Sequence, residues 1–312
     1  MSPEQRAQRW RLAGALAAVY VLWGSTYLAI KVAVETLPPF LMAGTRFMTA
    51  GVLLYAWTRW RGESAPHRRQ WRSAAIAGGL LMLMSNGLVC WAEKRIDSSL
   101  AALLVGTVPL WMMLLDWIRP RGARPSMPTI AGVLVGVLGV ALLVWPENRP
   151  GSVALDFAGV AALLTATLCW SLGSIYSRTA DLPRSPLLST AMQMLCGGFL
   201  QFTAGSLLGE WHAFDPARVT AGSVLSLAYL LVAGSLIGFT AYIWLLRNTS
   251  PAVASSYAFV NPLVAVLLGV YLGHEKLGSR TWLAAPVIVL AVVLVVLFKK
   301  TPAPAAGAAE VS

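Results

Sequence analysis

The chain has 312 residues, of which 57% are hydrophobic and 12% are charged, and its mean hydropathy is +0.66. An ordinary soluble domain carries roughly 25% charged residues, so this composition excludes a soluble globular protein. The formal net charge of +11 does not indicate nucleic-acid binding, because Lys and Arg lie in short loops between apolar stretches, as in membrane proteins oriented by positive charge.

Ten apolar stretches are long enough to cross a hydrocarbon core of ~30 Å as helices. They cover residues 12–34, 39–59, 73–92, 98–118, 128–146, 155–177, 186–209, 220–246, 251–273 and 281–298. The first is longer than a signal-peptide core and has no small-residue cleavage site, so we expect it to be retained. The predicted fold class is an all-α polytopic membrane protein with ten transmembrane helices, in which residues 299–312 form a disordered cytoplasmic tail.

The loops between the stretches predict the orientation. Ten spans place both chain ends on one side, and that side would carry 16 of the 24 Lys and Arg residues, against six on the other side. Basic residues accumulate in cytoplasmic loops. We therefore expect a multi-pass protein of the inner (plasma) membrane with both termini in the cytoplasm. The three cysteines all lie inside apolar stretches and predict no disulfide framework.

The sequence repeats itself. Two sets of residues recur at offsets of 147 and 153: Trp23 and Lys31 match Trp170 and Arg178, and Trp91, Lys94 and Pro109 match Trp244, Arg247 and Pro262. The repeats correspond to residues 12–146 and 155–298, with five spans each. An odd number of spans inserts the second repeat upside down relative to the first. Such inverted repeats are a transporter architecture, because two halves that exchange conformations open a central site to either side.

Aromatic and small polar residues in the first and sixth spans are candidates for a cavity wall. Trp23, Ser25 and Tyr27 lie in the middle to outer half of the first span, and Trp170 and Ser174 repeat the theme in the sixth. Bulky amphipathic rings at mid-membrane suit a wall that binds apolar or aromatic substrates. The alternative is plain helix packing, because small residues permit close approach.

Arg46 is the one charged residue well inside a span that cannot easily reach the interface. Such a residue costs a few kcal/mol on insertion scales and is a functional candidate, because its planar fork can hold a substrate carboxylate. The alternative is a structural pair or a bond to helix-end carbonyls. Lys31 lies nearer the surface with Glu35 one turn on, which predicts an i, i+4 ion pair.

Further polar groups and two prolines lie at membrane depth. The polar residues are either cavity ligands or contacts between helices; they are Asn86, Gln193, Tyr257 and Asn261. Pro262 lacks an N–H group, so the ninth span should kink or open locally, and Pro109 is its counterpart in the fourth span. We expect both prolines to act as hinges.

The acidic residues lie near span ends. We expect Asp116 to pair with Arg119 or Arg121 at the cytoplasmic interface, and Glu93 and Glu275 to be solvated at outer span ends. A proton-driven antiporter usually needs a carboxylate in the apolar interior. The sequence therefore predicts transport that does not depend on a mid-membrane acid.

Motifs for enzymatic chemistry are missing from the sequence. Its three histidines lie in loops far apart, and it has no P-loop, no Rossmann fingerprint and no paired carboxylates at the spacing of a Mg²⁺ motif. We therefore expect no cofactor, no metal site and no catalytic residues.

Four segments resemble a known family. They are WGSTYLAIKVAVETLPPFLMAGTRF from Trp23, WAEKRIDSSLAALLVGTVPL from Trp91, WSLGSIYSR from Trp170 and RNTSPAVASSYAFVNPLVAVLLG from Arg247. They resemble the EamA-type drug/metabolite exporters of the drug/metabolite transporter superfamily, in the right order and twice over. The resemblance implies a ten-helix inner-membrane carrier that exports metabolites, amino acids or amphipathic compounds through a central cavity.

The leading hypothesis is thus a secondary carrier, a monomer or homodimer, that exports a small organic molecule by alternating access. Two alternatives come from other classes. An intramembrane enzyme such as a lipid-linked transferase would need a chelating or nucleophilic cluster. A non-transporting membrane receptor would leave the inverted duplication unexplained.

Overall fold

The computed structural model describes residues 3–118, 126–144, 156–249, 251–254, 256–275 and 277–297. Within these ranges the chain forms helices and short connections, with no strand. The tail at residues 299–312 lies outside the described residues. So do Arg119, Arg121 and the side chain of Asp116, on which the expected interfacial pair depends.

In the described part of the chain, each half forms a series of long helical rods. The first half consists of α1 (Pro3–Ala17), η1 (Ala18–Leu22) and α2 (Trp23–Val34) in one rod, α3 (Pro39–Trp60), a rod of α4 (Arg68–Gly78), η2 (Gly79–Gly87) and α5 (Leu88–Glu93), then α6 (Ser98–Val105), α7 (Val108–Ile118) and α8 (Met127–Val144). The second half consists of α9 (Phe157–Thr179), α10 (Pro186–Leu207), the short α11 (Glu210–Ala213) and η3 (Pro216–Arg218), a rod of α12 (Ala221–Tyr229), η4 (Leu230–Phe239) and α13 (Thr240–Asn248), then α14 (Pro251–Ala254), α15 (Tyr257–Tyr271) and α16 (Ser279–Leu297).

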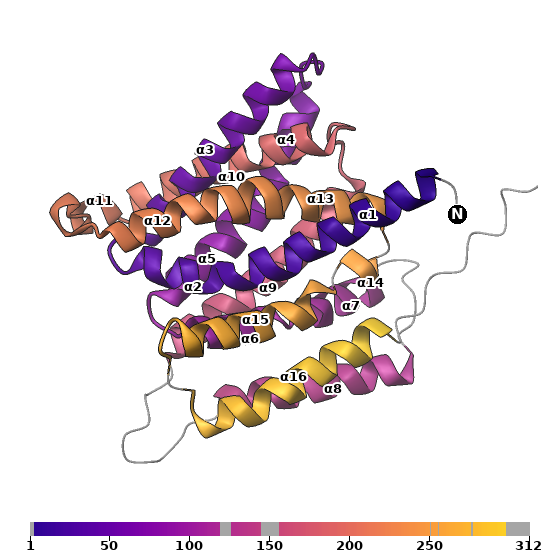
Figure 1. The fold of residues 1–312 in the computed structure, drawn as a ribbon, viewed down its shortest axis with the longest axis vertical. Helices are drawn as coiled ribbons and strands as arrows, with labels where there is room; N and C mark the ends of the chain where they lie inside the picture. Colours follow the sequence, from indigo (N-terminus) through magenta and orange to yellow (C-terminus); the bar gives the residue numbers. More distant parts are fainter. Residues whose placement is uncertain are drawn as a thin grey trace, which may run out of the picture.

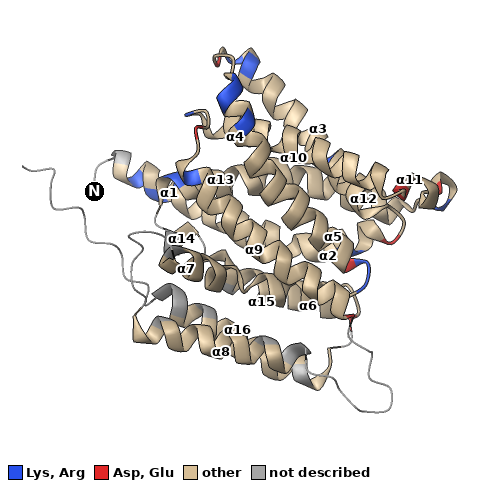
Figure 2. Ribbon diagram, turned by 180° about the vertical axis from the view of Figure 1, so that it is seen from behind, with Lys and Arg blue, Asp and Glu red and all other residues tan. Residues whose placement is uncertain are grey.

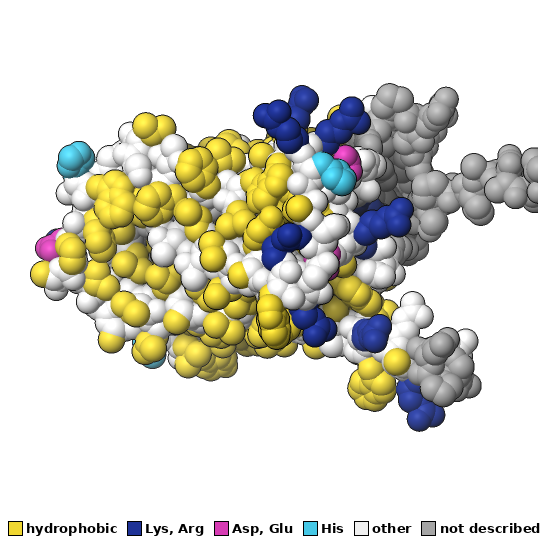
Figure 3. Space-filling model, turned by 90° about the horizontal axis from the view of Figure 1, so that it is seen from above, with side chains coloured by type: hydrophobic (Ala, Val, Ile, Leu, Met, Phe, Trp, Pro, Cys, Tyr) yellow, Lys and Arg dark blue, Asp and Glu magenta, His cyan; other side chains and the backbone are white. Residues whose placement is uncertain are grey.

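Five of the described helices are long and apolar enough to cross a membrane, judged by length and composition. They are Gln5–Val34, Arg68–Glu93, Ser98–Leu115, Phe157–Thr179 and Ala221–Asn248. Shorter apolar helices cover Ile130–Gly139, Val260–Tyr271 and Thr281–Ala291. Apolar side chains spread over the middle of the face in Figure 3, whereas Lys and Arg gather toward one end of it. The fold is therefore that of a membrane protein, and the number of ten spans stays a prediction.

The longest tight contact joins helices from the two halves. α3 and α10 have equivalent places, 147 residues apart, and they pack through glycines. A Cβ atom at Gly44 would lie 2.7 Å from the backbone nitrogen of Phe202, and one at Gly51 would lie 2.8 Å from that of Leu195. Because the partner number falls as the α3 number rises, the two helices run antiparallel. Small residues allow this close approach of backbones.

A second pair follows the same rule at the opposite edge of the molecule. α8 and α16 lie side by side below the other helices in Figure 1, and α3 and α4 lie at the upper edge. A Cβ atom at Gly136 would lie 3.3 Å from Ala291 Cβ, and one at Gly139 would lie 2.8 Å from Ile288 Cγ1. α8 and α16 are therefore also antiparallel, and each comes from a different half.

Two glutamates of the second half cap helices of the first half at one end of the bundle. Glu210 of α11 accepts hydrogen bonds from two N–H groups at the start of α3, at 3.2 and 2.9 Å. Glu275, which follows α15, accepts from Ser98 N (2.8 Å), Ser98 Oγ (2.6 Å), Ser99 N (3.1 Å) and Ser99 Oγ at the start of α6. A carboxylate is favourable where helix N–H groups are unpaired. We call this the Glu275 end; Lys and Arg gather around α1 and α4 at the opposite end (Figure 2).

Three rods contain a π-helical segment, in η1, η2 and η4. The last two have equivalent places, because residues 79–87 shifted by 153 become 232–240. A π-helix widens the turn and redirects the side chains that follow it, and such segments are frequent at functional sites. All three lie toward the middle of their rods, and residues of η2 and η4 line the central cavity.

One predicted hinge, Pro262, lies next to a helix break that precedes the other, Pro109. The fourth rod is interrupted between α6 and α7, and Pro109 follows that break as the second residue of α7. Pro262 lies inside α15, which continues through it to Tyr271. A Cβ atom at Gly106, in the break, would lie 3.1 Å from Pro262 Cγ. Pro262 therefore packs on the interruption before Pro109, and the hinge role of both prolines stays a prediction.

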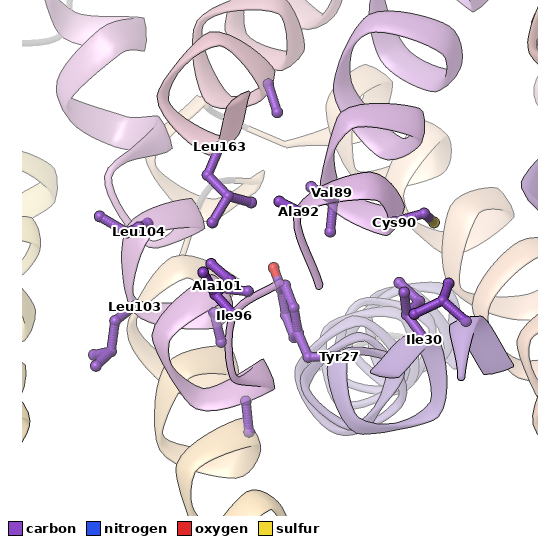
Figure 4. Close-up of a cluster of buried hydrophobic side chains, with 14 of the residues drawn as sticks. Tyr27, Ile30, Val89, Cys90, Ala92, Ile96, Ala101, Leu103, Leu104 and Leu163 are labelled. Atoms are coloured by element: carbon purple, nitrogen blue, oxygen red, sulfur yellow. The ribbon is translucent and has the colours of Figure 1, made fainter. Parts of the chain in front are cut away.

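A buried apolar cluster lies between α2, α5, α6 and α9. Figure 4 shows Tyr27 extending from α2 toward Ala92 and Ala101, with Leu104 and Leu163 on the other side. In a bilayer the lipid tails are as apolar as these side chains, so close packing rather than exclusion of water holds such helices together.

Candidate functional site

A cavity of about 70 Å³ lies at the centre of the bundle, between the two halves. It is bounded by α2, α3, η2, α5 and α6 from the first half and by α9, η4 and α15 from the second. Its lining residues are Trp23, Thr26, Tyr27, Ile30, Arg46, Phe47, Ser85, Asn86, Val89, Val105, Trp170, Gly234, Phe239 and Tyr257. Ligand pockets usually measure roughly 300–1,000 Å³, so the cavity is contracted in this conformation.

One wall of the cavity is aromatic. The Trp23 ring centre lies 5.4 Å from that of Trp170, 5.4 Å from that of Tyr257 and 6.3 Å from that of Phe239. Tyr242 supports the wall from behind, with its ring centre 5.0 Å from Trp23. Most of these pairs are edge-to-face or tilted, the arrangement that the ring quadrupoles favour. The wall can therefore receive an apolar or aromatic group.

The Trp23 indole is held in place by η4. Its Nε1 donates to the carbonyl oxygen of Gly234 at 3.1 Å. A Cβ atom at Gly238 would lie 2.5 Å from the same nitrogen, so only glycine leaves room for the indole there. The π-helical segment thus fixes the orientation of the central ring.

Arg46 supplies the charge of the cavity. Its side chain is 3% exposed, its Nε donates to Ser235 Oγ at 2.7 Å, and its guanidinium lies 4.6 Å from the centre of the Phe47 ring. Its Nη1 is buried and has no hydrogen-bond partner. Among the described residues the one ion pair joins Arg95 and Asp156, at 3.3 Å. Arg46, which lines the cavity, therefore carries an uncompensated positive charge and an unpaired donor.

The structure brings together six of the ten predicted binding residues, all of them in the cavity lining: Trp23, Tyr27, Arg46, Asn86, Trp170 and Tyr257. Trp170 adds a second buried donor, because its Nε1, which lies near the Tyr242 hydroxyl, makes no hydrogen bond of normal geometry. Two unpaired donors in one cavity suit a ligand that carries acceptor oxygens.

Two predicted serines lie outside the lining. Ser25 Oγ donates to Leu22 O of η1, in the same rod, at 2.8 Å and hydrogen-bonds with Tyr229 Oη of α12 at 2.5 Å. Ser174 bonds Tyr242 Oη at 2.8 Å, so it orients the ring behind the aromatic wall rather than the cavity surface.

Of the predicted amides Gln193 and Asn261, only Asn261 bonds to another helix. Gln193 is fully buried in α10, where its Nε2 donates to Ser189 Oγ of the same helix at 3.1 Å and its Oε1 has no hydrogen-bond partner. The amide of Asn261, oriented by its hydrogen bonds, donates to the carbonyls of Val19 and Tyr20 at 3.3 and 3.1 Å. Asn261 thus joins α15 to η1, whose Val19 and Tyr20 carbonyls also accept from the Trp23 backbone N–H.

Several lining residues were not predicted. They are Ile30, Phe47, Ser85, Val89, Val105, Gly234 and Phe239, whereas Thr26, which also lines the cavity, belongs with Trp23 and Tyr27 to the candidates of the first span. The sequence repeat could have identified one of them, because Phe239 is the counterpart of the predicted residue Asn86 at the offset of 153. Gly234 had no such signal, since its exposure to the cavity depends on the π-helical turns of η4.

Three expectations about charges are wrong. Glu93 is fully buried rather than solvated, and neither of its carboxylate oxygens has a hydrogen-bond partner. The Glu275 carboxylate accepts hydrogen bonds at the start of α6. Lys31 donates to Ile96 O at 2.8 Å and forms no ion pair with Glu35. Chain folding at the Glu275 end covers these groups. In the loop there, burial, followed by the charge of Glu275, raises the pKa of Asp97.

Metal ligands do not gather in the described residues, where no group of three or more His, Cys, Asp or Glu could hold an ion. The cavity offers a guanidinium, indole and amide groups and aromatic faces, which can bind an organic molecule.

Comparison with known proteins places the chain in a family. Residues 10–145 and 157–297 each match the EamA-like transporter family. The chain is 40% identical over 289 residues to the uncharacterized inner membrane transporter YedA of Escherichia coli K12, covering 92% of this chain and 91% of YedA. It is 25% identical to protein PecM of Dickeya dadantii, covering 88% of each. A solved crystal structure with 22% identity superposes with a TM-score of 0.64 over 91% of this chain and 96% of that one. The chain therefore belongs to the EamA-like transporter family and is a multi-pass membrane transporter.

Proposed function

We propose that the protein exports a small organic carboxylate with an apolar or aromatic body, by alternating access. The observation that carries this proposal is the buried Arg46 guanidinium with an unpaired Nη1, set beside an aromatic wall in a central cavity. A carboxylate would satisfy the guanidinium through charge-assisted hydrogen bonds, and the apolar body would lie against the Trp23 wall.

We further propose ten spans arranged as two inverted repeats. Antiparallel packing of α3 with α10 and of α8 with α16 supports this arrangement, because equivalent helices of inverted repeats run in opposite directions. The matching places of η2 and η4 support it too. The distribution of Lys and Arg supports an inner-membrane location with the Glu275 end outside and both termini in the cytoplasm.

The small volume of the cavity fits a stage of the transport cycle in which no solute is bound. About 70 Å³ does not admit a ring and a carboxylate together, so the helices must separate before such a solute binds. Export then means that the cavity opens to the cytoplasm, closes around the solute and opens at the Glu275 end.

The test uses three probes that share one ring and differ in charge. Proteoliposomes containing the protein are assayed for counterflow of labelled phenylacetate (anion), 2-phenylethanol (neutral) and phenethylamine (cation). We expect saturable flux for the anion. Arg46→Gln should weaken anion binding by about 10- to 100-fold, because a hydrogen bond to a charged group contributes about 1.5–3 kcal/mol.

Two variants separate charge from geometry and from nonspecific loss. Arg46→Lys keeps the charge but loses the planar fork, so anion flux should be intermediate. Arg59→Gln changes an exposed residue of the same helix and should leave flux unchanged. Equal flux of all three probes, or anion flux that is insensitive to Arg46→Gln, would count against the proposal.

A further inference from the structure

Glu93 is a buried acid that the cavity described above does not use. It is the last residue of α5, it is 0% exposed, and both of its carboxylate oxygens are buried without a hydrogen-bond partner. Its helix carries Val89, one turn earlier, into the cavity lining. The carboxyl group therefore lies one helical turn beyond the cavity, toward the Glu275 end.

Four titratable side chains influence the charge of Glu93, and two of them are hydrogen-bonded to other groups. From α2 they are Tyr27, which lines the cavity, and Lys31, whose Nζ donates to a backbone carbonyl. From its own helix there is Cys90. From the loop after α15 there is Glu275, which is bonded to the start of α6. None of them ion-pairs with the Glu93 carboxyl group or makes a hydrogen bond of normal geometry to it, although the Lys31 backbone N–H lies near it.

Internal symmetry shows that packing does not require an acid at this position. Trp91 and Lys94 match Trp244 and Arg247 at the offset of 153, so the counterpart of Glu93 is Leu246. Leu246 is buried in an apolar cluster. A leucine therefore fills the equivalent place in the second half, and an acid in the first half needs a reason other than packing.

An isolated carboxylate in such surroundings is strongly disfavoured, because nothing replaces the water it loses. The neutral acid is therefore the form that this conformation holds. We propose that Glu93 is a proton-binding site, protonated while the Glu275 end is closed and ionised when that end opens to water. On opening, the O–H bond of the carboxyl group breaks, water takes the proton, and the positive charge of Lys31 stabilises the carboxylate that forms.

The site is connected to the cavity through α2. Tyr27 lines the cavity and also faces Glu93, and Lys31 follows it by one turn. A movement of α2 that admits solute therefore changes the surroundings of Glu93. This coupling rests on the proposed transport, whereas proton binding itself does not. It differs from the expectation that transport does not depend on a mid-membrane acid only in placing the acid at the end of a span.

The first experiment needs no solute. Infrared spectra of the reconstituted protein are recorded over a pH series, and the C=O stretch of a neutral carboxylic acid is followed. We expect this band at neutral pH in the unmodified protein and its loss in both Glu93→Gln and Glu93→Leu, the latter copying the second half. Glu63→Gln, in an exposed loop, is the matched control and should keep the band. A band that survives both Glu93 variants would overturn the proposal.

The second experiment tests coupling, with phenylacetate as the probe and a pH dye inside the proteoliposomes. The unmodified protein should move protons when phenylacetate is added on one side, and Glu93→Gln should exchange phenylacetate without moving protons. Proton movement that persists in Glu93→Gln overturns the coupling. Absence of phenylacetate flux in the unmodified protein refutes the proposed function instead, and the infrared band still decides whether Glu93 binds a proton.

Discussion

The substitution Glu275→Gln should loosen one end of the bundle. In the structure the Glu275 carboxylate accepts two backbone N–H and two hydroxyl hydrogen bonds from Ser98 and Ser99. Glutamine keeps one acceptor oxygen, loses the charge and turns an NH₂ group toward donors. Hydrogen bonds to a charged group contribute about 1.5–3 kcal/mol each and are not additive. We therefore estimate a cost of about 3 kcal/mol for the closed state, which is about 100-fold in an equilibrium constant.

The native Cys90 reports on this opening. It is fully buried and lies next to Asn86 of the cavity lining, with its Sγ 3.6 Å from Asn86 Oδ1. In a background where Cys169 and Cys196 are replaced by serine, reaction of Cys90 with a membrane-impermeant thiol reagent requires the Glu275 end to open. The labelling rate should follow the open population, so Glu275→Gln should raise it by about 10- to 100-fold.

Controls make the result decisive. Glu63→Gln removes an acid from an exposed loop and should leave the Cys90 labelling rate unchanged. Thermal unfolding of each variant, measured in detergent, separates local opening from global unfolding. If Glu275→Gln labels at the rate of the unmodified protein while remaining folded, the four hydrogen bonds do not hold this end closed, and the reasoning is refuted.

Two further predictions concern packing and movement. Gly44→Leu places a side chain where a Cβ atom alone would lie 2.7 Å from the α10 backbone, so the thermal unfolding temperature should fall sharply. Gly14→Leu, where no neighbour lies within 4 Å, should have little effect. Equal unfolding temperatures of the two variants would contradict the α3–α10 contact. Pro262→Ala should restore a backbone donor within α15 and slow counterflow while membrane insertion stays intact, and unchanged flux would argue against Pro262 as a moving part.

Residue type and repetition predicted the chemistry of the site better than its geometry. Trp23, Trp170 and Arg46 stand out because bulky amphipathic or charged groups are unusual at membrane depth, and all three line the cavity. Glu93 was expected to be solvated because it lies near the end of a span. Position along a span indicates depth in the membrane, whereas burial depends on which loops cover the end of the span. Phe239 was missed because it is the last residue of a π-helical segment, whose wide turns break the spacing of 3.6 residues on which sequence reasoning relies.

The glycine contacts limit how this protein can change shape. α3 and α10 come from different halves, as do α8 and α16, and in each pair glycines bring backbone against backbone or side chain. Rocking one half as a rigid body against the other would shear both contacts. We therefore expect each pair to form a rigid unit with one helix from each repeat, and the rods between the two pairs to bend. The moving parts are then the π-helical segments and the interrupted helices, so the rigid units of this transporter do not coincide with its duplicated halves.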